Sequence, residues 1–323
     1  MKHKSLMLIL ISALMISTLA VESCKKDDGG VSGGGIYTGP TGTVTGKVVA
    51  ANGVTPIQGA SVTVRANYSN MPVAASDTGG NYTLAGVPTG TQTIVATKGL
   101  FVATTNANVL QNQTVMAPPA QLQSVGRLGY VVGSYDRIQD IIRDTLGYPM
   151  EEIVADSLRF SSVLARYVAI FLNCGMDLSF LDSASAATLR TYVSGGGRLY
   201  VSDWAQEVVR GVFPTDVMGF RRIGDVQTIY GRVVNASLRA FIEKDSVEIR
   251  YDLGAWEILD SLSNRPIVLL RGDYSSTSGF QTNKALAIMI DEGSGRVVYT
   301  TFHNEANITT DAVKVLTYFV FTL

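Results

Sequence analysis

This sequence contains little cysteine, little histidine and little charge. Among its 323 residues there are 2 Cys and 2 His, 16% of the residues are charged, and the formal net charge is -1. Two cysteines cannot form a disulfide framework, and so few soft ligands exclude a conventional zinc site. A chain without basic excess lacks the electrostatic footprint of a nucleic-acid-binding protein. We therefore expect no metal, no other cofactor and no nucleic-acid partner, and stability that comes from hydrophobic cores.

Long apolar runs are also scarce. The N-terminal run, residues 6–20, covers 15 residues, whereas a transmembrane helix needs about 20. The run follows a basic start and ends in Leu-Ala-Val-Glu-Ser-Cys at residues 19–24. This segment resembles a bacterial lipoprotein signal, which implies that residues 1–24 are a targeting segment and that Cys24 receives lipid. An ordinary secretory peptide is the alternative.

A spacer follows the expected lipid attachment site. Residues 25–42 begin with Lys-Lys-Asp-Asp and continue as a Gly/Ser-rich stretch that cannot bury a core, so we expect a flexible tether. The charged tetrapeptide resembles the export signal of Bacteroidetes surface lipoproteins. This resemblance implies a lipid anchor in the outer membrane, and it allows the protein to face outward at the cell surface.

Residues 43–117 show the pattern of a small all-β sandwich. Short segments of alternating apolar residues are separated by turn residues, without a helix signal between them. Residues 46–48, 56–62, 77–82 and 87–90 resemble the carboxypeptidase regulatory-like domain, a transthyretin-like sandwich. The resemblance implies a non-catalytic module, which is either a rigid stalk or a unit that binds glycan or protein. Tyr68 is the aromatic residue placed most clearly in a loop, and this scarcity favours the stalk.

After a predicted linker at residues 118–125, the pattern changes to alternating strands and helices in residues 126–323. Continuous apolar runs at 128–132 and 167–172 indicate strands covered on both faces. A triple glycine at 195–197 ends one helix directly before a strand at 199–201. We therefore expect two domains: an N-terminal all-β sandwich and a C-terminal flavodoxin-like α/β domain with a mostly parallel sheet and helices on both faces.

Other elements are expected from the same periodicities. Further strands are predicted at residues 226–234, 247–251, 266–270, 286–290 and 296–300, the last two as a hairpin. Further helices are predicted at 136–146, 183–194, 205–212 and 236–242, the second of them capped by Asp182 or Ser183, and a closing helix is predicted with Thr309 or Thr310 as its cap.

The end of the last expected strand carries a more specific pattern, in which His303 precedes Glu305 by two residues. This strand end resembles that of class I glutamine amidotransferase-like proteins, with His303 at the place of the catalytic histidine and Glu305 at that of the acid. In that family a Cys nucleophile follows the strand that corresponds to residues 199–201. Asp203 and Trp204 stand there instead, without the small flanking residues that a strained elbow needs. The resemblance therefore implies an amidotransferase-like domain that lacks the usual nucleophile.

Cys174, Asp203, His303 and Glu305 are weak catalytic candidates because each follows the carboxyl end of an expected strand. Each also has a structural alternative. Cys174 is then a small buried side chain, Asp203 a helix N-cap, and the pair of His303 and Glu305 an ordered strand end. Trp204 is either a stacking platform for a sugar ring or a core residue. Together with Asp203 and His303 it defines the expected ligand cleft.

These features predict a lipid-anchored protein of the cell envelope that is non-enzymatic and binds a glycan or another envelope protein. The alternative is a hydrolase that uses Cys174 or Asp203 together with His303 and Glu305. Replacing Cys174 and His303 by Ala separates the two, because it leaves a binder largely intact and abolishes a hydrolase. A gap well beyond hydrogen-bond reach between His303 and both candidates would argue against the hydrolase.

Overall fold

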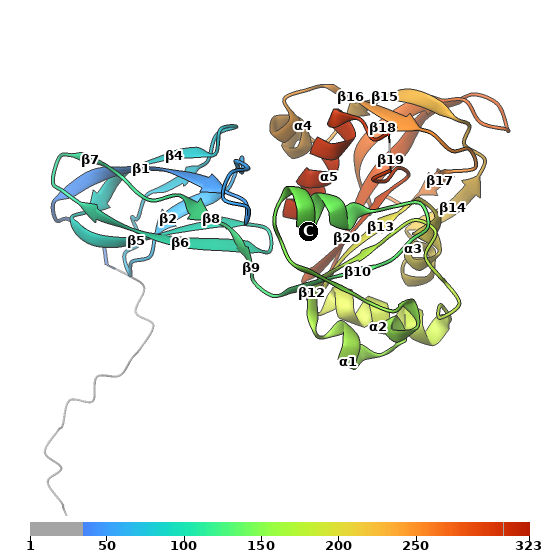
Figure 1. Cartoon of the computed structure of the whole chain (residues 1–323), viewed down its shortest axis with the longest axis horizontal. Coiled ribbons are helices and arrows are strands. Elements are labelled where there is room, and N and C mark those ends of the chain that lie inside the picture. Colours follow the sequence, from blue (N-terminus) through green and yellow to red (C-terminus); the bar gives the residue numbers. More distant parts are fainter. Residues whose placement is uncertain (1–34, 306) are drawn as a thin grey trace, which may run out of the picture.

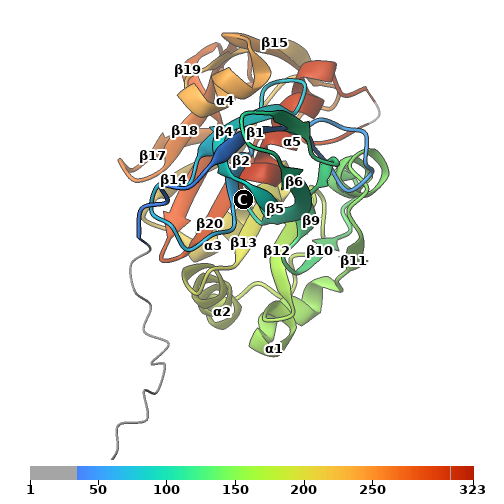
Figure 2. The same cartoon turned by 90° about the vertical axis from the view of Figure 1, so that its left-hand side faces the viewer.

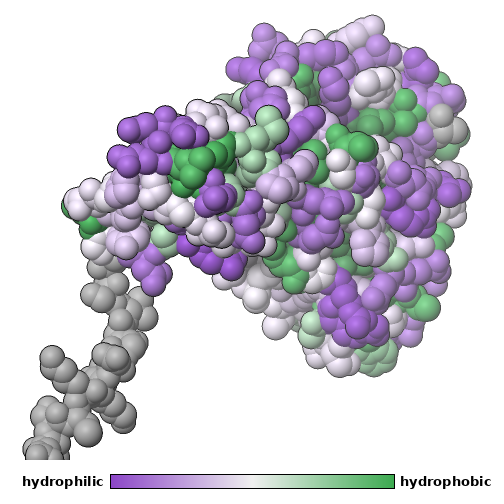
Figure 3. Space-filling model, turned by 60° about the vertical axis from the view of Figure 1, so that its left-hand side comes forward, coloured by the Kyte–Doolittle hydropathy of each residue, from purple (hydrophilic) through white to green (hydrophobic). Residues whose placement is uncertain are grey.

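The computed structural model describes residues 35–305 and 307–323, so the predicted targeting segment, Cys24 and residues 25–34 of the tether lie outside the described residues. A β-rich part lies at one side of the molecule, and a larger part with the helices lies at the other (Figure 1). The face drawn in Figure 3 is mixed, with small apolar groups among hydrophilic residues. None of the helices within the described residues is long and apolar enough to cross a membrane.

The N-terminal part consists of two small sheets. Its strands are β1 (Thr41–Val49), β2 (Ser61–Val64), β3 (Val73–Ala75), β4 (Asn81–Pro88), β5 (Gly90–Lys98), β6 (Phe101–Val109), β7 (Thr114–Met116), β8 (Ala120–Gln121) and β9 (Gln123–Ser124). One sheet has the order β4-β1-β7, with β8 also paired to β1, and the other has the order β3-β2-β5-β6-β9. Alternate side chains such as Val44, Leu84 and Ile94 are buried in one cluster, which confirms the predicted strand periodicity. The predicted linker, residues 118–125, contains the two short strands β8 and β9.

The larger part is organised by a nine-stranded sheet with the order β11-β10-β12-β13-β20-β19-β18-β15-β16. Its strands are β10 (Arg127–Val131), β11 (Met150–Glu152), β12 (Tyr167–Leu172), β13 (Arg198–Ser202), β15 (Gln227–Val233), β16 (Ser246–Tyr251), β18 (Ile267–Tyr274), β19 (Gln281–Glu292) and β20 (Gly295–Thr300). β14 (Val217–Arg222) and β17 (Glu257–Leu262) form a separate pair. Neither of these two was predicted.

The predicted mostly parallel sheet is wrong. β11, β10, β12, β13 and β20 are parallel to one another, whereas every pairing from β20 through β19, β18 and β15 to β16 is antiparallel. For two of these pairings the physical reason is connection length. A parallel neighbour needs a crossover of about a dozen residues or more, and short turns join β18 to β19 and β19 to β20.

Helices cover both faces of this sheet (Figure 2). On one face lie α1 (Ser161–Leu164), α2 (Ser183–Ser194) and α3 (Gln206–Val212), and on the other lie the π-helical turn η1 (Asp140–Thr145), α4 (Ala236–Ile242) and α5 (Thr310–Thr322). Short 3-10 turns, η2 (Ala155–Arg159) and η3 (Asp203–Ala205), precede α1 and α3. Successive strand residues serve opposite faces: Ile170 packs with the α2 side and Phe171 with the α5 side. The expected caps are confirmed, because Asp182 accepts the Ser185 N–H and Thr309 accepts the Ala312 N–H.

A single cluster of buried side chains extends from Val44 in the N-terminal part to Leu323 at the end of α5. Where the two parts meet, the ring of Phe101 lies 4.5 Å from that of Tyr148 and 4.9 Å from that of Phe321, measured between centroids. The predicted fold class is therefore wrong. The described chain is mostly β, with 42% of residues in strands and 20% in helices, its larger sheet is mixed, and an arrangement of two separate domains is not confirmed.

Candidate functional site

Three neighbouring strands carry the candidate residues at one edge of the nine-stranded sheet. Cys174 follows β12, Asp203 follows β13 and His303 follows β20. Because these strands are parallel neighbours, their carboxyl ends meet at the same edge. One potential ligand atom from each of the three side chains lies within 4.8 Å of the other two. The fold thus places side by side three residues that are far apart in the sequence.

His303 lies between two acids. Its Nδ1 is 3.8 Å from Oδ2 of Asp203, and its Nε2 is 3.5 Å from Oε2 of Glu305. The Cys174 thiol donates to the same Asp203 oxygen at 3.5 Å. Cys174 and Asp203 are buried, and 9% of the His303 side chain is exposed. The wide gap that would argue against a hydrolase is not observed.

Asp203 has a strained backbone, with a φ of 39°. A non-glycine residue in this left-handed region costs on the order of 1–3 kcal/mol, and such strain clusters at functional sites. Its side chain makes no capping hydrogen bond, and the N-cap of α3 is Ala205, so the alternative of Asp203 as a helix N-cap is wrong. The carboxylate instead accepts the Glu257 N–H at 2.7 Å, and the Asp203 carbonyl accepts the Tyr299 hydroxyl at 3.3 Å. A strained turn is therefore present although its flanking residues are not small.

A buried network ties the three segments together. The Ser202 hydroxyl donates to Asp136 and accepts the Cys174 N–H at 3.0 Å. Asp136 also accepts the Asn304 N–H at 3.0 Å. Each segment that carries a candidate residue is thus connected to one buried carboxylate. Sequence reasoning missed Asp136, although it follows β10 at the same sheet edge and the same rule could have found it.

Burial sets the protonation states within the cluster. It raises the pKa of the Cys174 thiol to about 11, so this thiol is neutral at pH 7 and a poor nucleophile. Burial also raises the pKa of Asp203 to about 7, against the lowering effect of nearby His303. For His303 burial lowers the pKa, but the side chains of Cys174, Glu305 and Asp136 outweigh burial and raise it well above its usual value. The Asp203 carboxylate, rather than the thiol, is therefore poised near neutral pH.

The cluster forms the floor of a cavity of about 210 Å³. The aromatic side chains that line it are Tyr135, Trp204, Tyr251 and Trp256. Tyr251 and Trp256 are buried, whereas Tyr135 is 40% exposed and Trp204 is half-buried. The Trp204 ring lies 5.0 Å from that of Tyr135 and 4.9 Å from the Arg222 guanidinium carbon. Trp204 is thus a cavity wall and not a core residue.

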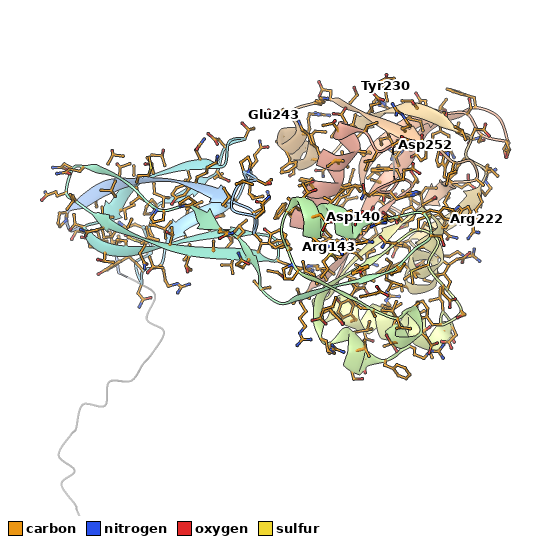
Figure 4. All side chains as sticks on the ribbon, in the orientation of Figure 1. Asp140, Arg143, Arg222, Tyr230, Glu243 and Asp252 are labelled. Atoms are coloured by element: carbon orange, nitrogen blue, oxygen red, sulfur yellow. The ribbon has the colours of Figure 1, made fainter. Side chains whose placement is uncertain are left out.

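A wider groove of about 740 Å³ adjoins this cavity and shares Tyr135, Asp252, Leu253 and Glu305 with it. Figure 4 labels Asp140 and Asp252, which come from η1 and from the segment after β16, and both line the groove. Cavity and groove together form one cleft with an aromatic pocket and a charged approach. All five sequence candidates, Cys174, Asp203, Trp204, His303 and Glu305, line the cavity. Asp252 and the buried aromatic walls were missed, because they come from the antiparallel half of the sheet and its surroundings.

Comparison with known proteins finds distant likenesses only. No family model and no curated protein matches the sequence. Among solved structures, a ThuA-like protein from Bacteroides uniformis is 13% identical, with a TM-score of 0.46 over 60% of this chain and 89% of that one. A glutamine amidotransferase from Thermotoga maritima is 12% identical, with a TM-score of 0.37 over 55% of this chain and 75% of that one. A β-galactosidase from Rahnella sp. R3 is 13% identical, with a TM-score of 0.41 over 60% of this chain and 31% of that one.

The structural neighbours of this chain thus include a ThuA-like protein and a glutamine amidotransferase, the class predicted for residues 126–323. TM-scores below 0.5 assign neither a family nor an activity. Only the geometry of the site itself bears on function.

Proposed function

We propose that this chain is a lipid-anchored protein of the cell envelope that binds a glycan in the cleft above Asp203 and His303. The lipoprotein-like end of residues 1–24 and the tether support the anchor, and the charged tetrapeptide supports an outer-membrane position. Residues 43–117 then act as a carboxypeptidase regulatory-like, transthyretin-like stalk. The burial of Phe101 between the two parts supports a stalk, because this aromatic side chain is not available to a ligand.

The observation that carries the proposal is the combination of aromatic walls and an acidic floor in one cavity. Tyr135 and Trp204 offer ring surface, while Asp203 and Glu305 offer acceptors for hydroxyl groups. Small-molecule sites typically combine aromatic lining with a few placed polar groups, in volumes of roughly 300–1,000 Å³. A cavity of about 210 Å³ therefore suits one ring-sized group, with the rest of the glycan in the groove. A protein partner is favoured less, because a stable protein interface buries about 800 Å² of surface on each side, whereas this cavity suits one ring-sized group.

A glycan screen of the full chain, followed by isothermal titration with the best ligand, tests this proposal. Trp204→Ala removes ring surface from the cavity, so we expect at least a tenfold loss of affinity, about 1.4 kcal/mol. Tyr68→Ala is the matched control, because Tyr68 is a 42% exposed aromatic residue of the N-terminal part, and we expect it to keep full affinity. Loss of binding in Tyr68→Ala with full binding in Trp204→Ala would place the ligand on the N-terminal part and contradict the proposal.

The anchor has its own test. Cell fractionation of the full chain is expected to place it with outer-membrane lipids, and Cys24→Ser is expected to release it from the membrane fraction. A Cys24→Ser variant that stays in the membrane fraction would refute lipid attachment at this residue.

Hydrolysis is the second candidate function, and the strained Asp203 beside His303 is the observation that favours it. A carboxylate held in this conformation after a strand is placed to attack the anomeric carbon of a glycoside: the bond to the leaving alcohol breaks, protonated His303 gives that alcohol its proton, and water then cleaves the resulting glycosyl ester and restores the carboxylate. The high pKa of the Cys174 thiol makes that residue the weaker nucleophile. Asp203→Asn is expected to abolish turnover of any glycan ester or glycoside that the screen identifies. Replacing Cys174 and His303 together by Ala leaves glycan binding largely intact if the protein is only a binder.

A further inference from the structure

We propose that Cys174, Asp203 and His303 bind a divalent transition metal ion of the zinc class, with Glu305 supporting the imidazole from its other side. This proposal goes beyond glycan binding, which requires no metal. Sequence reasoning expected no metal because it searched for a second histidine or a cysteine cluster. The fold supplies a buried carboxylate as the third ligand instead.

The distances fit one ion shared by the three side chains. The Cys174 sulfur is 3.5 Å from Oδ2 of Asp203, and Nδ1 of His303 is 3.8 Å from the same oxygen. Ligands that lie about 2.0–2.3 Å from zinc at tetrahedral angles are separated from one another by roughly 3.3–3.6 Å. The third separation, between the Cys174 sulfur and the ligating nitrogen of His303, is at most 4.8 Å, so the imidazole has to move inward toward the sulfur to complete the site.

The ligand types select the class of metal. A thiolate, an imidazole and a carboxylate together suit Zn²⁺, whereas Mg²⁺ and Ca²⁺ prefer oxygen ligands alone. Three protein ligands leave a fourth position, as in catalytic rather than structural zinc sites. All three residues line the cavity, so the fourth position is open to a ligand that occupies it.

His303 provides an independent observation that points to a ligand. Both of its ring nitrogens are buried, and neither has a hydrogen-bond partner among the described residues. A buried polar group without a partner costs about 1–3 kcal/mol and calls for an explanation. A metal ion bound to Nδ1 satisfies one nitrogen. The Nε2–H group then points to Glu305, whose carboxylate oxygen is 3.5 Å away, in the carboxylate–histidine–metal arrangement that orients ligating histidines.

Binding releases a proton from each ligand that is protonated beforehand. The S–H bond of Cys174 breaks, a sulfur–metal bond forms, and the thiol proton leaves to solvent, as do the protons that Nδ1 of His303 and the Asp203 carboxyl carry before the ion binds. His303 binds through the lone pair of Nδ1 and keeps its proton on Nε2. Oδ2 of Asp203 is the oxygen that faces both other ligands. Metal binding through this oxygen and covalent attack by it exclude each other, so the same experiment bears on the second candidate function.

Cobalt binding to the metal-free full chain tests the site. All samples carry Cys24→Ser, so that Cys174 is the only thiol. We expect one equivalent of Co²⁺ to produce the near-ultraviolet absorption of a cobalt–thiolate bond, and Zn²⁺ to displace the cobalt. Absence of this absorption in the otherwise unaltered protein overturns the proposal, and this measurement needs no further variant to fold.

Variants then assign the ligands. Cys174→Ala should abolish the thiolate absorption and lower affinity by more than about 100-fold, whereas Glu305→Gln should keep the absorption and lower affinity roughly 10–100-fold. Asp156→Asn is the control, because Asp156 is an exposed acid that lines neither the cavity nor the groove, and its affinity should not change. Unchanged affinity in Cys174→Ala refutes the site. No glycan is present in the titration, so its outcome is independent of glycan binding.

Discussion

Phe101 is the side chain through which we expect the N-terminal part and the larger part of the chain to be coupled in stability. It is the first residue of β6, it is 2% exposed, and its ring contacts those of Tyr148 and Phe321. Phe101→Ala removes the ring where the two parts meet. The hydrogen bonds of β6 are made by the backbone, so its pairing with β5 and β9 is retained.

The expected loss of stability follows from the burial of the ring. Truncating a buried Phe to Ala costs about 3–5 kcal/mol, because apolar surface is lost and a cavity remains. In a protein of a few hundred residues each kcal/mol shifts Tm by roughly 2–4 °C. We therefore expect the Tm of Phe101→Ala to fall by roughly 6–20 °C.

The positions of the tryptophans make the assay selective. The 2 Trp residues of the chain, Trp204 and Trp256, both lie in the larger part, so tryptophan fluorescence reports on that part alone. Far-ultraviolet circular dichroism reports on the strands of both parts. If one core holds both parts together, Phe101→Ala lowers the midpoints of both signals by the same amount.

A different pattern would refute this reasoning. If fluorescence keeps its wild-type midpoint while circular dichroism gains a separate earlier transition, the two parts unfold independently and the shared core carries no cooperativity. Tyr68→Ala is the control, because this exposed aromatic residue lies outside the shared cluster. Its effect should stay within about 0.5 kcal/mol.

Three further predictions concern the site, and the first two are measured with a chelator present. In Cys24→Ser protein, Cys174, whose pKa is raised to about 11 by burial, should resist alkylation at pH 8 in the folded state and react on unfolding; rapid native labelling would contradict this. The pKa of Asp203 is raised from 3.8 to about 7, so its contribution to stability is full below pH 3.8 and is lost as the pH rises through 7. In urea unfolding, the wild-type protein should lose up to about 4 kcal/mol of its free energy of unfolding between pH 4 and pH 8, and Asp203→Asn should not show this loss. Parallel pH profiles of the two proteins would show that Asp203 does not titrate this way. A Cβ at Gly133 would lie 2.2 Å from the Cys174 carbonyl oxygen, so Gly133→Ala should lower the free energy of unfolding by about 1–3 kcal/mol. Gly35→Ala, which meets open space, is its control and should be neutral.

Local elements of this chain could be predicted because local interactions specify them. α4 and β12 have the predicted bounds, and α2 and α5 begin after the expected caps, Asp182 and Thr309. Helix caps and apolar periodicity depend on residues a few positions apart, so they are readable without the rest of the fold. The candidate residues of the site were found for a similar reason, since each follows a strand that the sequence itself indicates.

The sequence by itself therefore determined elements such as β12 and α4 and the position of the candidate residues at strand ends, although it did not indicate β14 and β17. Only the tertiary structure decided that the large sheet is mixed, that Phe101 joins the two parts in one core, and that Asp203 is strained beside His303. The physical reason is distance along the chain. Strand order, the partners of a buried acid such as Asp136, and the φ angle imposed on Asp203 all depend on residues that meet only after long-range pairing.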